Sequence, residues 1–113
     1  MRLLGIDIRV ENPRTDPVSI EVKWADRWTL ADLLERLENQ LIGQYLRDHN
    51  AKYGIYLLGM FGQKQRWAGQ VAGTTLTFEE VLTIVTERAK DLAKSRPDVA
   101  DISVVGIDFR EPA

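Results

Sequence analysis

The sequence predicts an α/β fold, an open mixed four-stranded sheet with flanking helices in the order β-β-α-β-α-β. Apolar and polar residues alternate with strand periodicity over residues 3–10 and 19–24. Amphipathic helical patterns follow over residues 30–48 and 78–94, and each precedes a further apolar strand, over residues 53–62 and 102–110. A strand that follows a helix in this way pairs parallel to an earlier strand through a right-handed crossover.

Composition limits the class of protein. The 113 residues are enough for one domain with a real core, and 44% hydrophobic and 28% charged residues are typical of a soluble globular protein. The absence of cysteine excludes disulfides, thiolate zinc sites and cysteine nucleophiles, and a single histidine excludes a His-rich metal site. With no apolar run of membrane-spanning length and no secretory signal, we expect a cytoplasmic protein without membrane contact.

The first two strands should form an antiparallel hairpin, because the connection between them is short and rich in proline and Asx residues. If this loop is symmetric about Arg14, the numbers of residues paired across the two strands sum to 28. Asp7 then lies opposite Glu21, and Lys23 lies opposite Gly5. Because residues two apart in a strand share a face, Glu21 and Lys23 point the same way, and their β-branched neighbours point the other way.

Two carboxylates placed directly opposite each other repel. The arrangement fits Mg²⁺ or Mn²⁺, since Mg²⁺ takes one or two protein carboxylates and fills its octahedron with water and substrate phosphate. A nearby lysine can stabilise charge on a phosphate or activate water, so these residue types fit hydrolysis of a phosphodiester. The alternative is a pair of exposed acids partly neutralised by Arg9 and Lys23, and spacing alone does not separate the two.

The pattern D-x13-E-x-K on adjacent strands, followed by a long helix, resembles the PD-(D/E)XK nuclease superfamily. The resemblance covers about residues 3–62 and includes the runs Gly5-Ile6-Asp7-Ile8 and Ile20-Glu21-Val22-Lys23. It implies a restriction-endonuclease-like core and Mg²⁺- or Mn²⁺-dependent endonuclease cleavage of DNA. Asp7 and Glu21 would bind the metal, and Lys23 would be the catalytic lysine.

The helix that usually precedes the first strand in this superfamily is missing from residues 1–113. We therefore expect one domain that belongs to a longer chain or is completed by a homodimer partner. The net charge of −2 weighs against non-specific binding of nucleic acid, which normally needs a basic patch, but it does not exclude a local one.

Two further groups are candidates for substrate contact. Gln40, Gln44 and Arg47 form a polar row beside the apolar stripe of the first helix, where they could bind phosphate or simply border the buried face. Lys64 and Arg66 lie in a polar loop with Trp67, which could stack on a base or fold onto the core.

Two other functions remain open. The same fold could be a catalytically inactive module for nucleic-acid binding or protein assembly, as the acidic net charge and the missing helix favour. The E-x-K motif could also occur by chance on an unrelated α/β scaffold.

Overall fold

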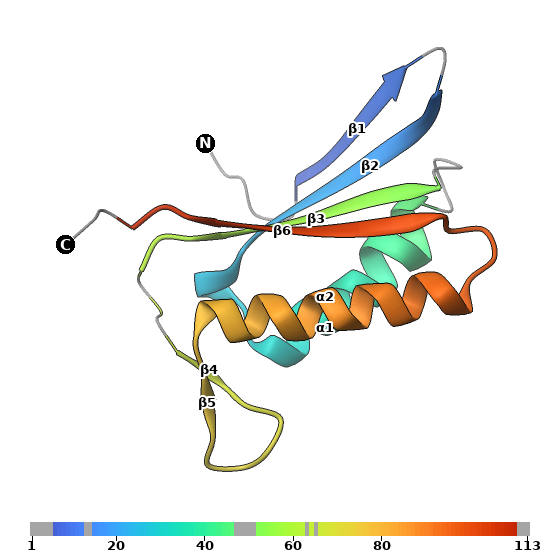
Figure 1. Cartoon of the computed structure of the whole chain (residues 1–113). Coiled ribbons are helices and arrows are strands. Elements are labelled where there is room, and N and C mark those ends of the chain that lie inside the picture. Colours follow the sequence, from blue (N-terminus) through green and yellow to red (C-terminus); the bar gives the residue numbers. More distant parts are fainter. Residues whose placement is uncertain (1–5, 13–14, 47–51, 63, 65, 111–113) are drawn as a thin grey trace.

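The computed structural model describes residues 6–12, 15–46, 52–62, 64 and 66–110, and Figure 1 shows their arrangement. The main sheet has the strand order β1-β2-β3-β6. Its strands are β1 (Ile6–Asn12), β2 (Thr15–Trp24), β3 (Tyr53–Met60) and β6 (Asp101–Asp108). β1 is antiparallel to β2, whereas β2, β3 and β6 are parallel. The mixed α/β class and the parallel pairing of β2 with β3 are therefore confirmed.

The helical part of the chain consists of two long segments. A 3₁₀ turn, η1 (Ala25–Arg27), is followed by α1 (Leu30–Arg36), which continues as a π-helical segment, η2 (Leu37–Leu46). The second long helix, α2, spans Phe78–Ser95. The sequence predicted both segments but not the change from α- to π-helical hydrogen bonding.

Local capping fixes where both helices begin. The Thr29 side chain accepts a hydrogen bond of 3.0 Å from the Asp32 amide. Thr77 and Glu80 form a reciprocal capping box, in which each side chain accepts from the backbone amide of the other residue. In both cases a side-chain oxygen satisfies an amide that has no partner within the helix.

Both long helical segments lie on one side of the main sheet (Figure 1). The chain steps from β2 to β3 to β6 in a single direction across the sheet. Two crossovers of the same hand that step in the same direction place their helices on the same face. These helices therefore cover one face of β3 and leave its other face uncovered.

The core lies between this covered face and the helices. Leu33, Leu37, Leu41, Val81 and Val85 are fully buried there. The covered face of β3 contributes Tyr56, Leu58 and Met60.

The burial of the two faces of β2 is the reverse of what their polarity predicts. On β2, the covered face carries Ser19, Glu21 and Lys23, all of which are buried. Ile20 and Val22 lie on the uncovered face and are only partly buried. The charged pair is therefore inside and the β-branched residues face outward, which excludes a solvent-facing Glu21–Lys23 pair.

A small second sheet was not predicted. β4 (Trp67–Ala68) pairs antiparallel with β5 (Thr75–Leu76) in the segment before α2. Trp67 is fully buried, and its indole Nε1 donates to the carbonyls of Ala25 and Trp28, each at 3.1 Å. Trp67 therefore folds onto the core and is not available to stack on a base.

Within the described residues, no helix combines the length and the apolar character needed to cross a membrane.

Candidate functional site

The hairpin register brings the three predicted site residues together. In the pairing of β1 with β2, Asp7 is the partner of Glu21 and Ile6 is the partner of Val22, so numbers of paired residues sum to 28 as predicted. A register shift occurs only farther along, between Val10 and Asn12. Gly5, the predicted partner of Lys23, lies outside the described residues, as does the side chain of Asp7.

Glu21 and Lys23 form an enclosed ion pair. Lys23 Nζ lies 2.9 Å from Glu21 Oε1, and the two side chains are 2% and 0% exposed. Both residues point from the C-terminal half of β2 toward the helices. The carboxylate thus holds the ammonium in a fixed place in a region with little water, where electrostatic interactions are strong.

An aromatic ring lies beside this pair, and a guanidinium lies beside the same ring. Lys23 Nζ lies 4.7 Å from the centroid of the Trp28 ring, and the Arg36 guanidinium carbon lies 5.3 Å from the same ring. Such distances allow a cation–π attraction. Trp28 comes from the connector before α1, and Arg36 from the last turn of that helix. Neither residue was among those that the sequence predicted for the site.

Tyr56 is a neighbour of Glu21 on the adjacent strand. The two residues are partners in the parallel register of β2 and β3. The Tyr56 hydroxyl is buried and donates to the Leu33 carbonyl at 2.8 Å. Burial, followed by the negative charge of Glu21, raises the pKa of Tyr56 well above its ordinary value, so this hydroxyl stays protonated. The sequence predicts that β3 runs parallel to β2, but it does not give the register that pairs Tyr56 with Glu21.

Further polar atoms are buried in the same layer. Ser19 Oγ, two residues before Glu21 on the same face, has no hydrogen-bond partner among the described residues. The same holds for Gln40 Oε1, which comes from η2. Buried polar groups are usually satisfied, and internal water is one common partner. The layer between β2 and the first helix is therefore more polar than an ordinary core.

The residues predicted to contact substrate differ in their exposure and in their contacts. Gln40 is half-buried, whereas the Gln44 side chain and Arg47 lie outside the described residues. Lys64 Nζ donates to the Trp28 carbonyl at 3.2 Å, so this lysine supports the fold around Trp28. Arg66 is exposed and lines a hollow of about 150 Å³ together with Arg110, beside the N-terminus of α2. Of these residues, Arg66 is the one whose charge is accessible.

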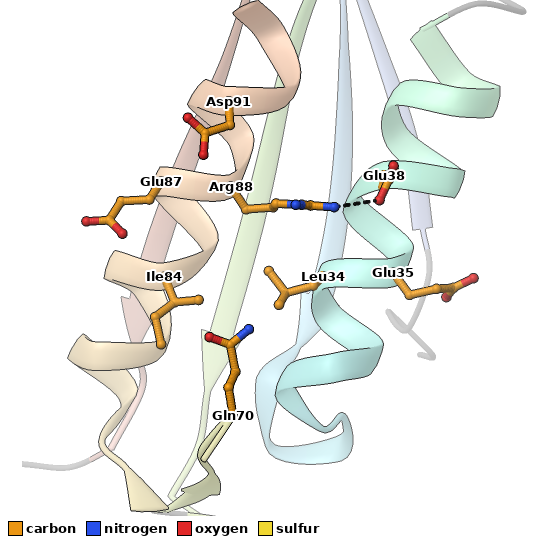
Figure 2. A pocket seen from close by; sticks show the side chains of 8 residues that line it. All are labelled: Leu34, Glu35, Glu38, Gln70, Ile84, Glu87, Arg88 and Asp91. Carbon is orange, nitrogen blue, oxygen red and sulfur yellow. Dashed lines mark hydrogen bonds and ion pairs between the residues drawn. The ribbon is translucent and has the colours of Figure 1, made fainter. Parts of the chain in front are cut away.

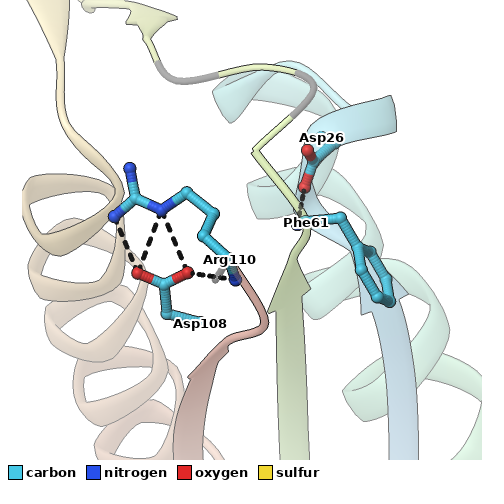
Figure 3. Close-up of polar contacts among 4 residues, drawn as sticks. All are labelled: Asp26, Phe61, Asp108 and Arg110. Carbon is cyan, nitrogen blue, oxygen red and sulfur yellow. Dashed lines mark hydrogen bonds and ion pairs between the residues drawn. The ribbon is translucent and has the colours of Figure 1, made fainter. Parts of the chain in front are cut away.

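The ends of β2 and β3 are joined near this hollow. Asp26 accepts from the backbone amides of Phe61 and Lys64 at 2.9 and 3.2 Å. Asp108 binds the Arg110 guanidinium at 2.7 Å, and these hydrogen bonds lower the pKa of Asp108 (Figure 3). Asp108 therefore serves a local ion pair at the end of β6.

Another groove lies between the two long helical segments. It has a volume of about 390 Å³, and Figure 2 shows that its walls come from both helices and from Gln70. Four carboxylates line it, and Arg88 binds one of them, Glu38, at 3.1 Å. An acidic groove repels phosphate, so it is not a nucleic-acid site.

The described residues offer few ligands for a divalent metal. Among the residues that the structure describes, no group of three or more His, Cys, Asp and Glu side chains is placed to hold a metal ion. Mg²⁺ needs only one or two protein carboxylates and keeps several waters. Glu21 with Asp7, its partner across the hairpin, meets that requirement in chemical type and in backbone position.

Comparison with known proteins does not assign this chain to a family. No family model, no curated protein and no solved structure matches this chain.

Proposed function

We propose that this protein is a metal-dependent nuclease that hydrolyses DNA phosphodiester bonds. The observation that supports the proposal best is the hairpin register, in which Asp7 is the partner of Glu21 while Lys23 Nζ lies 2.9 Å from Glu21 Oε1. Two carboxylates and a lysine in one short stretch of sheet can bind a divalent metal and stabilise charge on a phosphate, as metal-assisted phosphodiester hydrolysis does.

Each residue has a role in the proposed reaction. Asp7 and Glu21 would hold Mg²⁺ or Mn²⁺, which supplies a Lewis acid and a more acidic bound water. Lys23 would stabilise the negative charge that develops on the phosphate, and Glu21 orients its ammonium. The exposed Arg66 would contact the DNA backbone without reading its sequence.

Access to the site requires movement. Because Lys23 is 2% exposed and Glu21 is 0% exposed, a phosphodiester reaches them only when the groups above them shift. Trp28 and Arg36 are both half-buried, so they are the groups whose displacement would open the site from the helix side. Replacing Trp28 by alanine should therefore increase the cleavage rate.

Cleavage of supercoiled plasmid DNA, with Mg²⁺, Mn²⁺ or EDTA, tests the proposal. The wild-type chain should nick the plasmid with either metal and not with EDTA, and Lys23→Ala should abolish the nicking. Lys52→Ala is the matched control, because it removes an exposed lysine just before β3. If Lys23→Ala still nicks the plasmid in a metal-dependent way, the assigned site is contradicted. If the wild type nicks the plasmid under none of these conditions, the proposal for this chain is contradicted.

A second function has an observation in its favour. The full enclosure of Glu21 and Lys23 suits a structural ion pair in a catalytically inactive binding or assembly module. Thermal unfolding with and without Mg²⁺ separates the two. A metal that binds the folded chain stabilises it by mass action, whereas an inactive module gains nothing from Mg²⁺.

A further inference from the structure

The uncovered face of the main sheet is apolar. On β3, Tyr53, Ile55 and Leu57 alternate with buried residues and so point away from the helices. On β6, Val105 and Ile107 are 40% and 36% exposed, whereas Ile102, on the covered face, is buried. Both long helical segments lie on the other side of the sheet (Figure 1). A sheet face of this kind normally packs against another layer.

An aromatic cluster sits at one end of this face. The Phe61 and Phe109 rings stack with centroids 4.9 Å apart, and Trp24 meets Phe61 edge-on at 5.0 Å. Phe61 is 50% exposed and Phe109 is 45% exposed. Large rings that pack on one another yet remain half-exposed leave much apolar area in water, which favours burial against a partner.

We propose that this face is the interface of a homodimer, in which two copies pack sheet against sheet. Strand alternation places two charged residues on this face among the described positions, Asp16 near the start of β2 and Asp101 at the start of β6. Both are acidic, so the face offers nothing to the phosphates of a nucleic acid. An apolar face of this kind is complementary to itself across a two-fold axis. Two sheets of this type pack about 10 Å apart with their strands rotated by about 30°.

The area of the face is sufficient for such a dimer. Four strands about 4.8 Å apart, with about eight residues rising about 3.3 Å each, span roughly 19 by 26 Å, or about 500 Å². Two copies would then bury at least about 1,000 Å² in total, which reaches the lower limit of specific interfaces. Within the 113 residues, no stretch outside the described parts exceeds five residues, too few to cover four strands.

This inference does not depend on the proposed nuclease activity. Glu21 and Lys23 point to the helix-covered side of the sheet, so the dimer would leave each candidate site on its outer side. Changes on the uncovered face therefore test association without altering the site.

Sedimentation velocity on the 113-residue chain, from micromolar to submillimolar concentration, tests the proposal. The wild type should become a dimer as concentration rises, and Val105→Glu should weaken association more than tenfold, because it would bury a carboxylate in the interface. Val71→Glu is the matched control, since Val71 is 70% exposed in the loop between β4 and β5 and lies away from this face. A wild type that stays monomeric, or a dimer that Val105→Glu does not weaken, would overturn the proposal.

A second measurement avoids any effect of the charge on folding. Because the chain has no cysteine, Val105→Cys and Val71→Cys each give a single thiol for alkylation. The rate of alkylation at position 105 should fall as protein concentration rises, and the rate at position 71 should not change. Equal, concentration-independent rates at both positions would exclude the interface.

Discussion

Replacing Lys23 by methionine removes the ammonium and keeps an unbranched side chain, so the substitution tests the enclosed ion pair. At an effective dielectric constant of about 20, Coulomb's law gives an attraction of about 6 kcal/mol for charges 2.9 Å apart. Desolvation of both groups cancels much of this attraction while the pair is intact. Removing one partner leaves the other charge buried, which costs about 3–5 kcal/mol in comparable pairs.

Equilibrium unfolding in urea measures this loss of stability. With a typical slope of about 1.5 kcal/mol per molar urea, Lys23→Met should lower the unfolding midpoint by roughly 2–3 M. The double variant Glu21→Gln/Lys23→Met should recover most of the lost stability, because no buried charge of the pair remains. A loss below about 1 kcal/mol for Lys23→Met would mean that water reaches the pair, and the enclosed geometry would then be refuted.

Three further predictions concern the buried Tyr56 hydroxyl, the cap of α2 at Thr77 and the contact of Gly59 with Trp24. Tyr56→Phe removes a buried hydrogen bond and should cost about 1 kcal/mol in urea unfolding. Because the pKa of Tyr56 is raised by folding, its contribution is complete below the unfolded value of about 10 and is lost as the pH rises above it. The difference between wild type and Tyr56→Phe should therefore shrink in alkaline solution, and an unchanged difference would argue against the raised pKa. Thr77→Ala should destabilise the chain by about 1 kcal/mol through loss of the cap. The capping bonds lower the pKa of Glu80, so its stabilising effect is present above the unfolded pKa and disappears as the pH falls through the lowered value. Urea unfolding at acidic and neutral pH would show this, and an effect of Thr77→Ala that does not vary with pH would contradict it. Gly59→Ala places a methyl group against the Trp24 ring and should cost about 1–3 kcal/mol, measured by thermal unfolding; a neutral effect would mean that the ring moves freely.

Several features of the fold could be predicted because local chemistry determines them. The predicted partner of Glu21 is correct although the loop is not symmetric. Asn12 pairs with Thr15, so their numbers sum to 27, and the register shift between Asn12 and Val10 restores the sum of 28 toward Asp7. Thr29 and Thr77 identified both helix starts because a side-chain oxygen satisfies an amide near the first turn. The helix between β2 and β3 required a parallel pair, because a hairpin turn cannot make that connection.

The identity of the buried face could not be predicted from β2 alone. By polarity, Ile20 and Val22 should face the core, and Glu21 and Lys23 should face water. The structure shows the opposite, because the strand order sends both crossovers in one direction and puts both helices over the charged side. The ion pair makes this burial tolerable, since each charge neutralises the other.

The candidate site was only partly predictable for a related reason. Asp7, Glu21 and Lys23 lie on one hairpin, so alternation and loop length were enough to associate them. Trp28, Arg36 and Tyr56 join the site through the packing of a connector, a helix end and a neighbouring strand. No local pattern encodes such contacts, because they depend on the register and the helix placement together.

Binding of Mn²⁺ or Mg²⁺, measured by isothermal titration calorimetry, tests the proposed nuclease site most directly because it requires no knowledge of the substrate. We expect saturable binding to the wild-type chain, with affinity reduced at least tenfold in Glu21→Gln and in Asp7→Asn. Circular dichroism should show that both variants remain folded. If the wild type binds neither metal, or if both variants bind as tightly as the wild type, Asp7 and Glu21 do not form a metal site and the proposed nuclease mechanism is contradicted.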